Sequence, residues 1–334
     1  RPAIAATMIS TVGWRGLFLV NVPVTVVAAA IGWNQLPDRR PVAASQPVDA
    51  VGLVLVTALT TAALLLAADR LAVTAAAAVV VTLSTVLYLR WARRAPHPIL
   101  RLEHVTDRRF RPVHLTAMGV IGAGVGANSL LPVYMRTVRG QSTGVAAFSV
   151  LFMTIGWTAA AIVSSRLQDR HPGERVCLLG ASMALPAVIV AAVVIAVDAP
   201  IAVVYAAFTA VGAGVGMTTA TGGAVLQGRS PAEDMGRING AHQFLRTMAI
   251  TFGIATVGAI VLAVVAARTG DVELVRDALA GGDADDDPTD PAVLRALRDG
   301  YAWAIGAMSL GAGAAFVAGV GLARSRTPEL ASAP

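Results

Sequence analysis

The chain has 334 residues, of which 56% are hydrophobic and only 14% are charged, and its mean hydropathy is +0.68. A soluble domain carries about 25% charged residues, and a disordered chain combines low hydrophobicity with high net charge, so the composition argues against both classes. All 26 basic side chains are arginines, and most of them lie between apolar runs, which indicates membrane topology rather than nucleic-acid binding. The one cysteine, Cys177, excludes an internal disulfide framework and a multi-cysteine metal site.

Ten apolar runs follow one another along the sequence and predict an all-α, polytopic membrane protein with about ten transmembrane segments. The first run, 3–12, is too short to cross a hydrocarbon layer of ~30 Å at ~1.5 Å per residue, so it is expected to be a partial span. The nine longer runs cover residues 16–36, 48–68, 71–89, 113–134, 145–163, 176–197, 201–226, 241–267 and 301–323.

The linkers between these runs carry unequal numbers of arginines. When linker 37–47 is assigned to the cytoplasm and the sides alternate, the cytoplasmic linkers hold sixteen arginines and the outer ones hold eight. Because cytoplasmic loops are enriched in basic residues, we expect the C-terminus to be cytoplasmic. The long outer loop 268–299 is acidic near its centre, and the basic stretch 91–111 separates the first four runs from the last six.

Two glycine runs, 122–126 and 212–216, resemble fragments of a dinucleotide-binding fingerprint. Both lie inside apolar runs rather than between a strand and a helix, so they predict close packing of helices through small residues. The acidic stretch 283–288 resembles the start of a calcium loop, but Pro288 and Leu294 stand where that loop needs glycine and glutamate. We therefore expect no metal site.

Catalytic motifs are missing from the sequence. No HExxH motif or phosphate-binding loop is present, and the histidines are scattered, at His97, His104, His114, His171 and His242. The sequence therefore predicts a protein that is not an enzyme and needs no cofactor.

The segment after the first run reads GWRGLFLVNVPV over residues 13–24. It resembles the WRWxFxxNxPxG stretch of the major facilitator superfamily, in its fourteen-span drug:proton antiporter branch. Just upstream, Pro2, Ala5 and Ala6 lie in a segment similar to the antiporter motif GPxxGG, with Arg1 at the first glycine and alanines at the later pair.

A second segment, SRLQDRHPGER at 165–175, resembles the cytoplasmic G-x-L-x-D-R-x-G-x-R loop of the same family. The resemblance implies a conformational latch that bridges two helical bundles in one state and opens in another. The alternative is a solvated, positively charged cytoplasmic loop. The residues of this predicted latch are Arg166, Asp169, Arg170 and Arg175.

The resemblance also implies a domain organisation. Residues 1–37 would be the last two spans of an N-terminal six-helix bundle, and 48–90 would be two additional spans. The basic cytoplasmic linker 91–111 would lead to a C-terminal six-helix bundle at 112–323 and a cytoplasmic tail at 324–334. We expect the chain to begin inside the family's fifth span, and the acidic residue that the family uses for proton coupling to belong to earlier spans.

The implied function is secondary active transport, with proton-coupled efflux of amphipathic drugs by alternating access across the bacterial plasma membrane. The expected partners are a small-molecule substrate and the lipid bilayer, without nucleic acid and with the oligomeric state left open. An exporter of a small metabolite, a non-transporting scaffold or sensor, and an inactive fragment are the alternatives. The candidate cavity residues are Asn128, Tyr134, Trp157, Thr218, Thr221, Gln243 and Arg246. Each also has a structural explanation, such as Arg246 reaching toward lipid headgroups.

Overall fold

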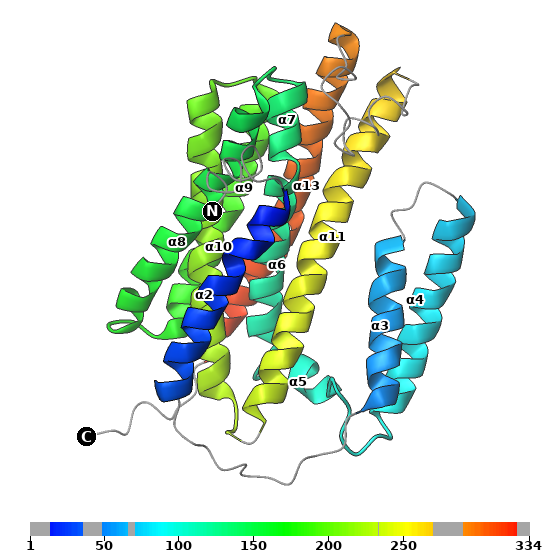
Figure 1. Ribbon diagram of the computed structural model, residues 1–334, viewed down its shortest axis with the longest axis vertical. Coiled ribbons are helices and arrows are strands. Elements are labelled where there is room, and N and C mark those ends of the chain that lie inside the picture. The colour runs from blue at the N-terminus through cyan, green and yellow to red at the C-terminus, as the bar shows by residue number, and fades with distance from the viewer. Residues whose placement is uncertain (1–13, 36–48, 66–70, 233, 270–289, 326–334) are drawn as a thin grey trace.

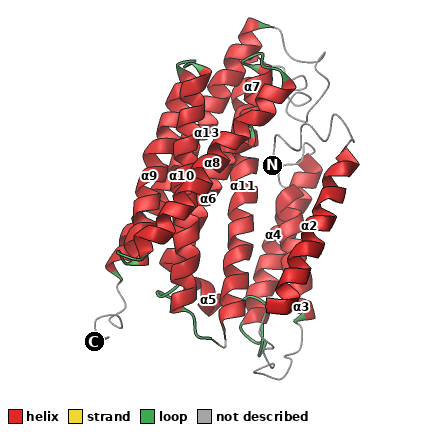
Figure 2. Cartoon of the chain, turned by 60° about the vertical axis from the view of Figure 1, so that its left-hand side comes forward, coloured by secondary structure: helices red, strands yellow, loops and turns green. Residues whose placement is uncertain are grey.

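A computed structural model of the chain describes residues 14–35, 49–65, 71–232, 234–269 and 290–325. Every regular element in these ranges is a helix (Figure 2). The helices are α2 (Trp14–Gln35), α3 (Ala50–Leu65), α4 (Leu71–Ala92), α5 (Leu102–Thr106), α6 (Arg111–Ser129), α7 (Leu131–Thr137), α8 (Thr143–Gln168), α9 (Gly173–Ala196), α10 (Ile201–Arg229), α11 (Met235–Thr269) and α13 (Pro291–Arg324).

Seven helical segments within the described ranges are long and apolar enough to span a membrane, with α6 and α7 together forming one of them. Two shorter apolar stretches, Val22–Trp33 and Ala50–Leu65, lie in α2 and α3. These helices confirm the predicted fold class. The short run at 3–12, which includes Pro2, Ala5 and Ala6, lies outside the described residues.

Helices α6 to α13 pack into one bundle, and α3 and α4 form a separate hairpin beside α11 (Figure 1). Within the bundle, α10 packs against α8 and α9, while α6 packs against α11 and α13. The helices run between two ends, which we name after the short helices that lie there. The α5 end is the lower end in Figure 1, and the α7 end is the upper end.

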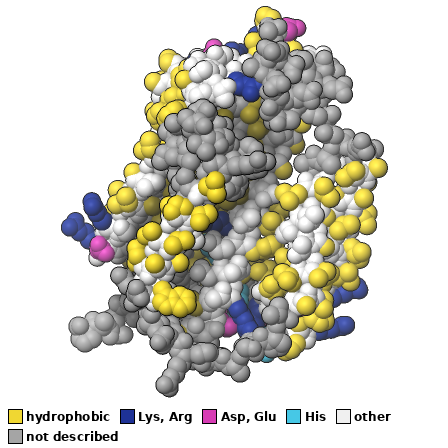
Figure 3. Space-filling view, viewed as in Figure 1, with side chains coloured by type: hydrophobic (Ala, Val, Ile, Leu, Met, Phe, Trp, Pro, Cys, Tyr) yellow, Lys and Arg dark blue, Asp and Glu magenta, His cyan; other side chains and the backbone are white. Residues whose placement is uncertain are grey.

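Arginine side chains gather at the α5 end. The linkers at this end are the ones that the sequence analysis assigned to the more basic side. Figure 3 shows arginine side chains in the lower half of the view, with patches of hydrophobic side chains on the helices above them. The described arginines at this end are Arg90, Arg93, Arg94, Arg101, Arg108, Arg109, Arg111, Arg166, Arg170, Arg175, Arg229, Arg237 and Arg324. Large apolar side chains such as Leu310 (78% exposed) and Val317 (69% exposed) cover the outside of the bundle, as expected for a surface that faces lipid.

Two predicted boundaries differ from the structure. The run 113–134 breaks at Leu130, whose backbone (φ −99°, ψ 5°) ends α6, and α7 follows with Pro132 in its first turn. Helix α13 begins at Pro291, so its first turns occupy the end of the predicted outer loop. The Asp290 carboxylate caps α13 by accepting the Ala292 N–H at 2.7 Å, whereas the acidic stretch 283–288 lies outside the described residues.

Asp49 connects the α3–α4 hairpin to the segment that follows it. Its carboxylate accepts hydrogen bonds from the Gly52 N–H (2.8 Å), the Trp91 indole N–H (2.8 Å) and the Ile99 N–H (2.9 Å). Burial alone would raise the pKa of Asp49, but the three hydrogen bonds outweigh burial and hold the pKa below its ordinary value. The start of α3 is therefore fixed to the end of α4 and to the chain beyond it.

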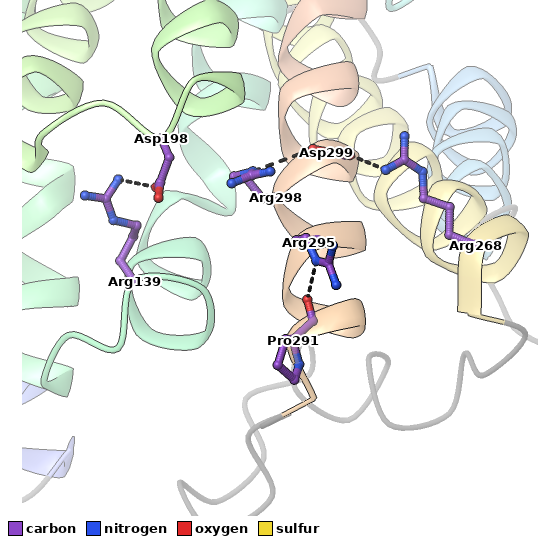
Figure 4. Close-up of polar contacts among 7 residues, drawn as sticks. All are labelled: Arg139, Asp198, Arg268, Pro291, Arg295, Arg298 and Asp299. Carbon is purple, nitrogen blue, oxygen red and sulfur yellow. Dashed lines mark hydrogen bonds and ion pairs between the residues drawn. The ribbon is translucent and has the colours of Figure 1, made fainter.

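Polar contacts hold the helices together at the α7 end (Figure 4). Arg139, just beyond α7, donates to the carboxylate of Asp198 at 2.9 Å and to the Ala199 carbonyl at 2.8 Å. Asp198 has a positive φ of 53°, the left-handed conformation that often ends a helix, and it follows the C-terminus of α9. Arg268 of α11 pairs with Asp299 of α13, which fastens these two helices to each other.

Glycines bring the helix backbones into direct contact in the middle of the bundle. A Cβ atom built on Gly212 of α10 would lie 2.0 Å from the Met153 carbonyl oxygen of α8, and one on Gly216 would lie 2.1 Å from the Trp157 carbonyl oxygen. Between α6 and α11, a Cβ on Gly253 would lie 2.3 Å from the Gly122 carbonyl oxygen. The packing role predicted for the two glycine runs is confirmed.

We predict that Gly212→Ala destabilises the protein, because the new methyl group would force α8 and α10 apart. Overpacking of this kind costs about 1–3 kcal/mol of the free energy of unfolding. The matched control is Gly223→Ala on the same helix, where a Cβ meets no atom within 4 Å. The apparent melting temperature in detergent should fall for Gly212→Ala alone, and equal melting temperatures would contradict the close α8–α10 contact.

Candidate functional site

Three of the predicted cavity residues meet across the bundle. The guanidinium carbon of Arg246, on α11, lies 5.8 Å from the centre of the Trp157 ring on α8, and Arg246 Nη1 donates to Gln243 Oε1 at 3.4 Å. A cation at this distance from an indole face is attracted by the negative face of the ring. Trp157, Gln243 and Arg246 therefore form one cluster, called the Arg246–Trp157 cluster below.

Helix α10 packs next to both helices of this cluster. It contacts both α8 and α11, and Gly216 lies directly against the backbone of Trp157. Among the described residues, Arg246 has no carboxylate partner, and its Nε atom is buried without a hydrogen bond. The cluster thus combines a positive charge that is not neutralised, an aromatic face and an amide side chain.

The other predicted cavity residues lie in different surroundings. Thr218 and Thr221 are fully buried in α10 and point toward α9, because a Cβ on Gly180 would lie 2.5 Å from Thr218 Oγ1 and one on Gly173 would lie 3.7 Å from the Thr221 methyl group. Tyr134 is fully buried at the α7 end, where its ring packs edge-to-face on Tyr301 with centroids 5.3 Å apart. These three side chains pack between helices of the bundle.

Asn128 lies near the C-terminal end of α6 and is 8% exposed, and its Oδ1 atom has no hydrogen-bond partner among the described residues. Phe152 of α8 and Tyr205 of α10 stack with centroids 4.1 Å apart, a pair that the sequence did not single out. The pair adds a second aromatic surface between α8 and α10.

The side chains of the predicted latch are exposed at the α5 end. Arg166, Asp169, Arg170 and Arg175 form no ion pair with any other residue that the structure describes. The ion pair next to this loop joins Glu174, in the first turn of α9, to Arg229 at the end of α10, with 2.9 Å between Oε1 and Nη2. The side chain of Arg229 is 6% exposed, so this charge pair is largely buried.

The Arg229 side chain forms hydrogen bonds to several chain segments at the α5 end. Besides Glu174, its guanidinium donates to the Arg109 carbonyl at 2.9 Å and to the Ser325 carbonyl at 3.3 Å. The residues that it joins lie just before α6, at the start of α9 and just after α13. The sequence did not predict this contact, although a glutamate at a helix N-terminus and an arginine at a helix C-terminus each interact favourably with the dipole of their helix.

Three of the histidines that are scattered in the sequence meet at the α5 end. His114 Nδ1 of α6 lies 3.0 Å from His242 Nδ1 of α11, and His114 Nε2 lies 2.9 Å from the His104 carbonyl oxygen of α5. All three side chains are at most 6% exposed. Burial lowers the pKa of His104, and Asp234, 3.8 Å away, acts in the opposite direction without reversing the shift.

No group of three or more histidine, cysteine, aspartate or glutamate side chains converges as a metal site within the ranges that the structure describes. The described part of the chain thus offers two polar sites, the first partly exposed and the second buried. One is the Arg246–Trp157 cluster, and the other is the histidine pair one helical turn nearer the α5 end.

Comparison with known proteins assigns a family. Residues 2–254 match the family described as the Major Facilitator Superfamily. The Multidrug resistance protein B homolog of Mycobacterium tuberculosis is 26% identical over 189 residues, which cover 54% of this chain and 34% of that protein. The Methylenomycin A resistance protein of Streptomyces coelicolor is 27% identical over 176 residues, which cover 51% of this chain and 36% of that protein. The matched segments thus span about a third of the length of these relatives.

Solved structures show the same fold. A bacterial homologue of the human lysosomal transporter Spinster, in its inward-facing and occupied conformation, has a TM-score of 0.51 and 16% identity, over 76% of this chain and 57% of that one. Its unoccupied inward-facing structure has a TM-score of 0.52 and 15% identity, over 83% of this chain and 66% of that one. Together with the family match, these structures confirm the resemblance seen in the sequence.

We predict that Glu174→Gln destabilises the protein, because it leaves the buried Arg229 without a countercharge. Hydrogen bonds to charged groups contribute about 1.5–3 kcal/mol, so the melting temperature should fall measurably. Asp169→Asn, in the short connection that precedes α9, is the matched control, because Asp169 is exposed and its substitution should change the free energy of unfolding by less than about 0.5 kcal/mol. A larger fall in melting temperature for Asp169→Asn than for Glu174→Gln would contradict the stabilising role given to the Glu174–Arg229 ion pair.

Proposed function

Since the chain belongs to the Major Facilitator Superfamily, we propose that it forms part of a secondary transporter, rather than an enzyme, that exports amphipathic cations in exchange for protons. Its membrane-spanning helices and its family support movement of a small molecule across a bilayer. The printed names of two relatives, a multidrug resistance protein and a methylenomycin A resistance protein, support drug efflux. The proton gradient, rather than a cofactor, supplies the energy in this proposal.

The observation that carries the proposal is the position of Arg246 over Trp157. Here a cation of the protein itself lies over an aromatic ring between two membrane-spanning helices, at a partly exposed position. A cationic, amphipathic substrate offers the same two features, a positive charge and apolar surface, so it can replace the guanidinium on the ring. The Arg246 guanidinium can move away from the Trp157 ring, because none of the described residues holds it through an ion pair and its long side chain can reach toward the α5 end.

Alternating access requires one bundle to move against another. The glycine contacts and the Glu174–Arg229 pair favour movement of this bundle as a unit, because both join helices within it. The exposed side chains of Arg166, Asp169, Arg170 and Arg175 are available to contact a second bundle. We propose that they close the α5 end in one conformation and separate from the second bundle in the other.

The proposed location is the bacterial plasma membrane, with the α5 end and the C-terminus in the cytoplasm. The support is the concentration of arginines at that end, which agrees with the positive-inside rule.

Ethidium, a permanently charged amphipathic cation, tests the transport proposal. We predict that cells expressing the transporter that contains this chain export ethidium and that Trp157→Ala slows export about five- to thirtyfold, the range that corresponds to loss of a ~1–2 kcal/mol cation–π contact. Arg246→Lys should also impair export, since lysine keeps the charge but lacks the planar guanidinium that stacks on the ring.

The matched control is Ile162→Ala, on the same helix as Trp157 but 53% exposed on the lipid side, and it should export normally. Membrane expression of all variants is measured in parallel. Normal export by both Trp157→Ala and Arg246→Lys would show that the cluster does not contact the substrate. Absence of ethidium export by the wild-type transporter that contains this chain would contradict the proposed substrate class.

The orientation is tested with single cysteines at exposed positions of the two ends. Because Cys177 is fully buried, Cys177→Ala provides a background without a competing thiol. In intact cells, a membrane-impermeant maleimide should label Thr143→Cys, at the α7 end, and should label His171→Cys, at the α5 end, only after the membrane is opened. The reverse pattern would place the C-terminus outside.

A further inference from the structure

The neutral form of the buried histidine pair has only one possible arrangement of protons. The His104 carbonyl can only accept, so His114 Nε2 carries a hydrogen and donates it. His114 Nδ1 is then a lone pair, and the hydrogen between the two rings must belong to His242 Nδ1. One ring lone pair is left over, at His242 Nε2, and among the described residues it has no hydrogen-bond partner.

We propose that the His114–His242 pair is a proton-binding site of the transporter and that a proton enters it at His242 Nε2. This inference rests on the transport function proposed above. The proton adds to the free lone pair while the other two hydrogen bonds of the pair stay in place. Its loss to water restores the neutral pair, so loading and release exchange one proton without breaking the contact between α6 and α11.

The charged groups around the pair support a site that loads and unloads. Arg246 follows His242 by four residues on α11, so the two side chains are neighbours on one helix face, and like charges at this spacing repel. Toward the α5 end, His104 is faced by Asp234, Arg101, Glu103 and Arg237. No other charged side chain of the described residues acts on the pair, and no carboxylate pairs with it directly.

Because of this placement, a proton on His242 and a cationic substrate at Trp157 repel each other. A proton on His242 lies next to Arg246, and a substrate cation bound at Trp157 brings a further positive charge to the same cluster. Substrate binding therefore favours release of the proton, and proton binding favours release of the substrate, because the coupling between two ligands is reciprocal. Mutual exclusion of this kind is what exchange of a drug cation for a proton requires.

The first experiment measures ethidium binding by the purified protein in phosphatidylethanolamine–phosphatidylglycerol vesicles between about pH 4 and about pH 8. Ethidium keeps its charge over this range, so a pH dependence reports on the protein. For the wild type, the ethidium Kd should fall as the pH rises, by up to about tenfold per pH unit where the pair titrates. For His242→Gln and His114→Gln, the Kd should change by less than about twofold over the same range.

Glutamine keeps a hydrogen-bonding amide at each position but cannot bind a proton, so these variants remove titration with little change in packing. The matched control is His171→Gln, an exposed histidine of the α8–α9 loop, and it should retain the wild-type pH dependence. A wild-type dependence that survives in both His242→Gln and His114→Gln overturns the proposal. Melting temperatures of all variants identify any that fail to fold.

The second experiment needs no substrate and separates this inference from the proposed function. In protein labelled with ¹⁵N-histidine, nitrogen resonances report protonation of each ring as the pH changes. We expect a titrating signal that is lost in His242→Gln and altered in His114→Gln, because the two rings titrate as one coupled pair. If the wild type binds no ethidium but shows this signal, the substrate class is wrong and the proton site stands. If neither ring titrates over the range, the proton site is wrong whatever ethidium does.

Discussion

Direct contact between helix backbones is the constraint on which both polar sites depend. In a bilayer, lipid is as apolar as the helix surface, so helices gain stability mainly by approaching closely through small residues. The α8–α10 approach at Gly216 places the backbone of Trp157 against α10, and the α6–α11 approach at Gly122 and Gly253 sets the spacing across which His114 meets His242. A wider separation at either contact would move the functional side chains apart.

Much of the fold could be predicted because hydropathy and length decide it. An apolar run of about twenty residues in a bilayer must satisfy its backbone hydrogen bonds internally, and a helix does so. The boundaries that differed have local causes. Arg295, Arg298 and Asp299 lower the hydropathy of the first turns of α13, so the apolar run begins only at residue 301, although Asp290 and Pro291 start the helix earlier.

The candidate sites were less predictable because they depend on which helix faces meet. Helix α10 carries small or apolar residues on all its faces, so the sequence does not show which face meets which neighbouring helix. It therefore could not distinguish Trp157 and Arg246, which contact each other, from Thr218, which faces α9. His114 and His242 are 128 residues apart, and their contact depends entirely on tertiary packing. The family loop drew attention to Asp169, whereas the buried ion pair uses Glu174, because the first turn of α9 directs that side chain toward the end of α10.

The segment between α4 and α5 is a rigid connection, because hydrogen bonds hold it to the α3–α4 hairpin. Beyond α4 the chain folds back, and the Tyr88 hydroxyl donates to the Leu100 carbonyl at 2.7 Å while the Leu100 N–H donates to the same hydroxyl at 2.9 Å. Asp49 holds the neighbouring Ile99, and α5 begins only two residues after Leu100. Because these contacts hold residues 99 and 100 to the hairpin, we expect a displacement of α3 and α4 to pull on α5. The His104 carbonyl belongs to α5, so mechanical tension in the hairpin would act on the hydrogen bond of the His114 imidazole.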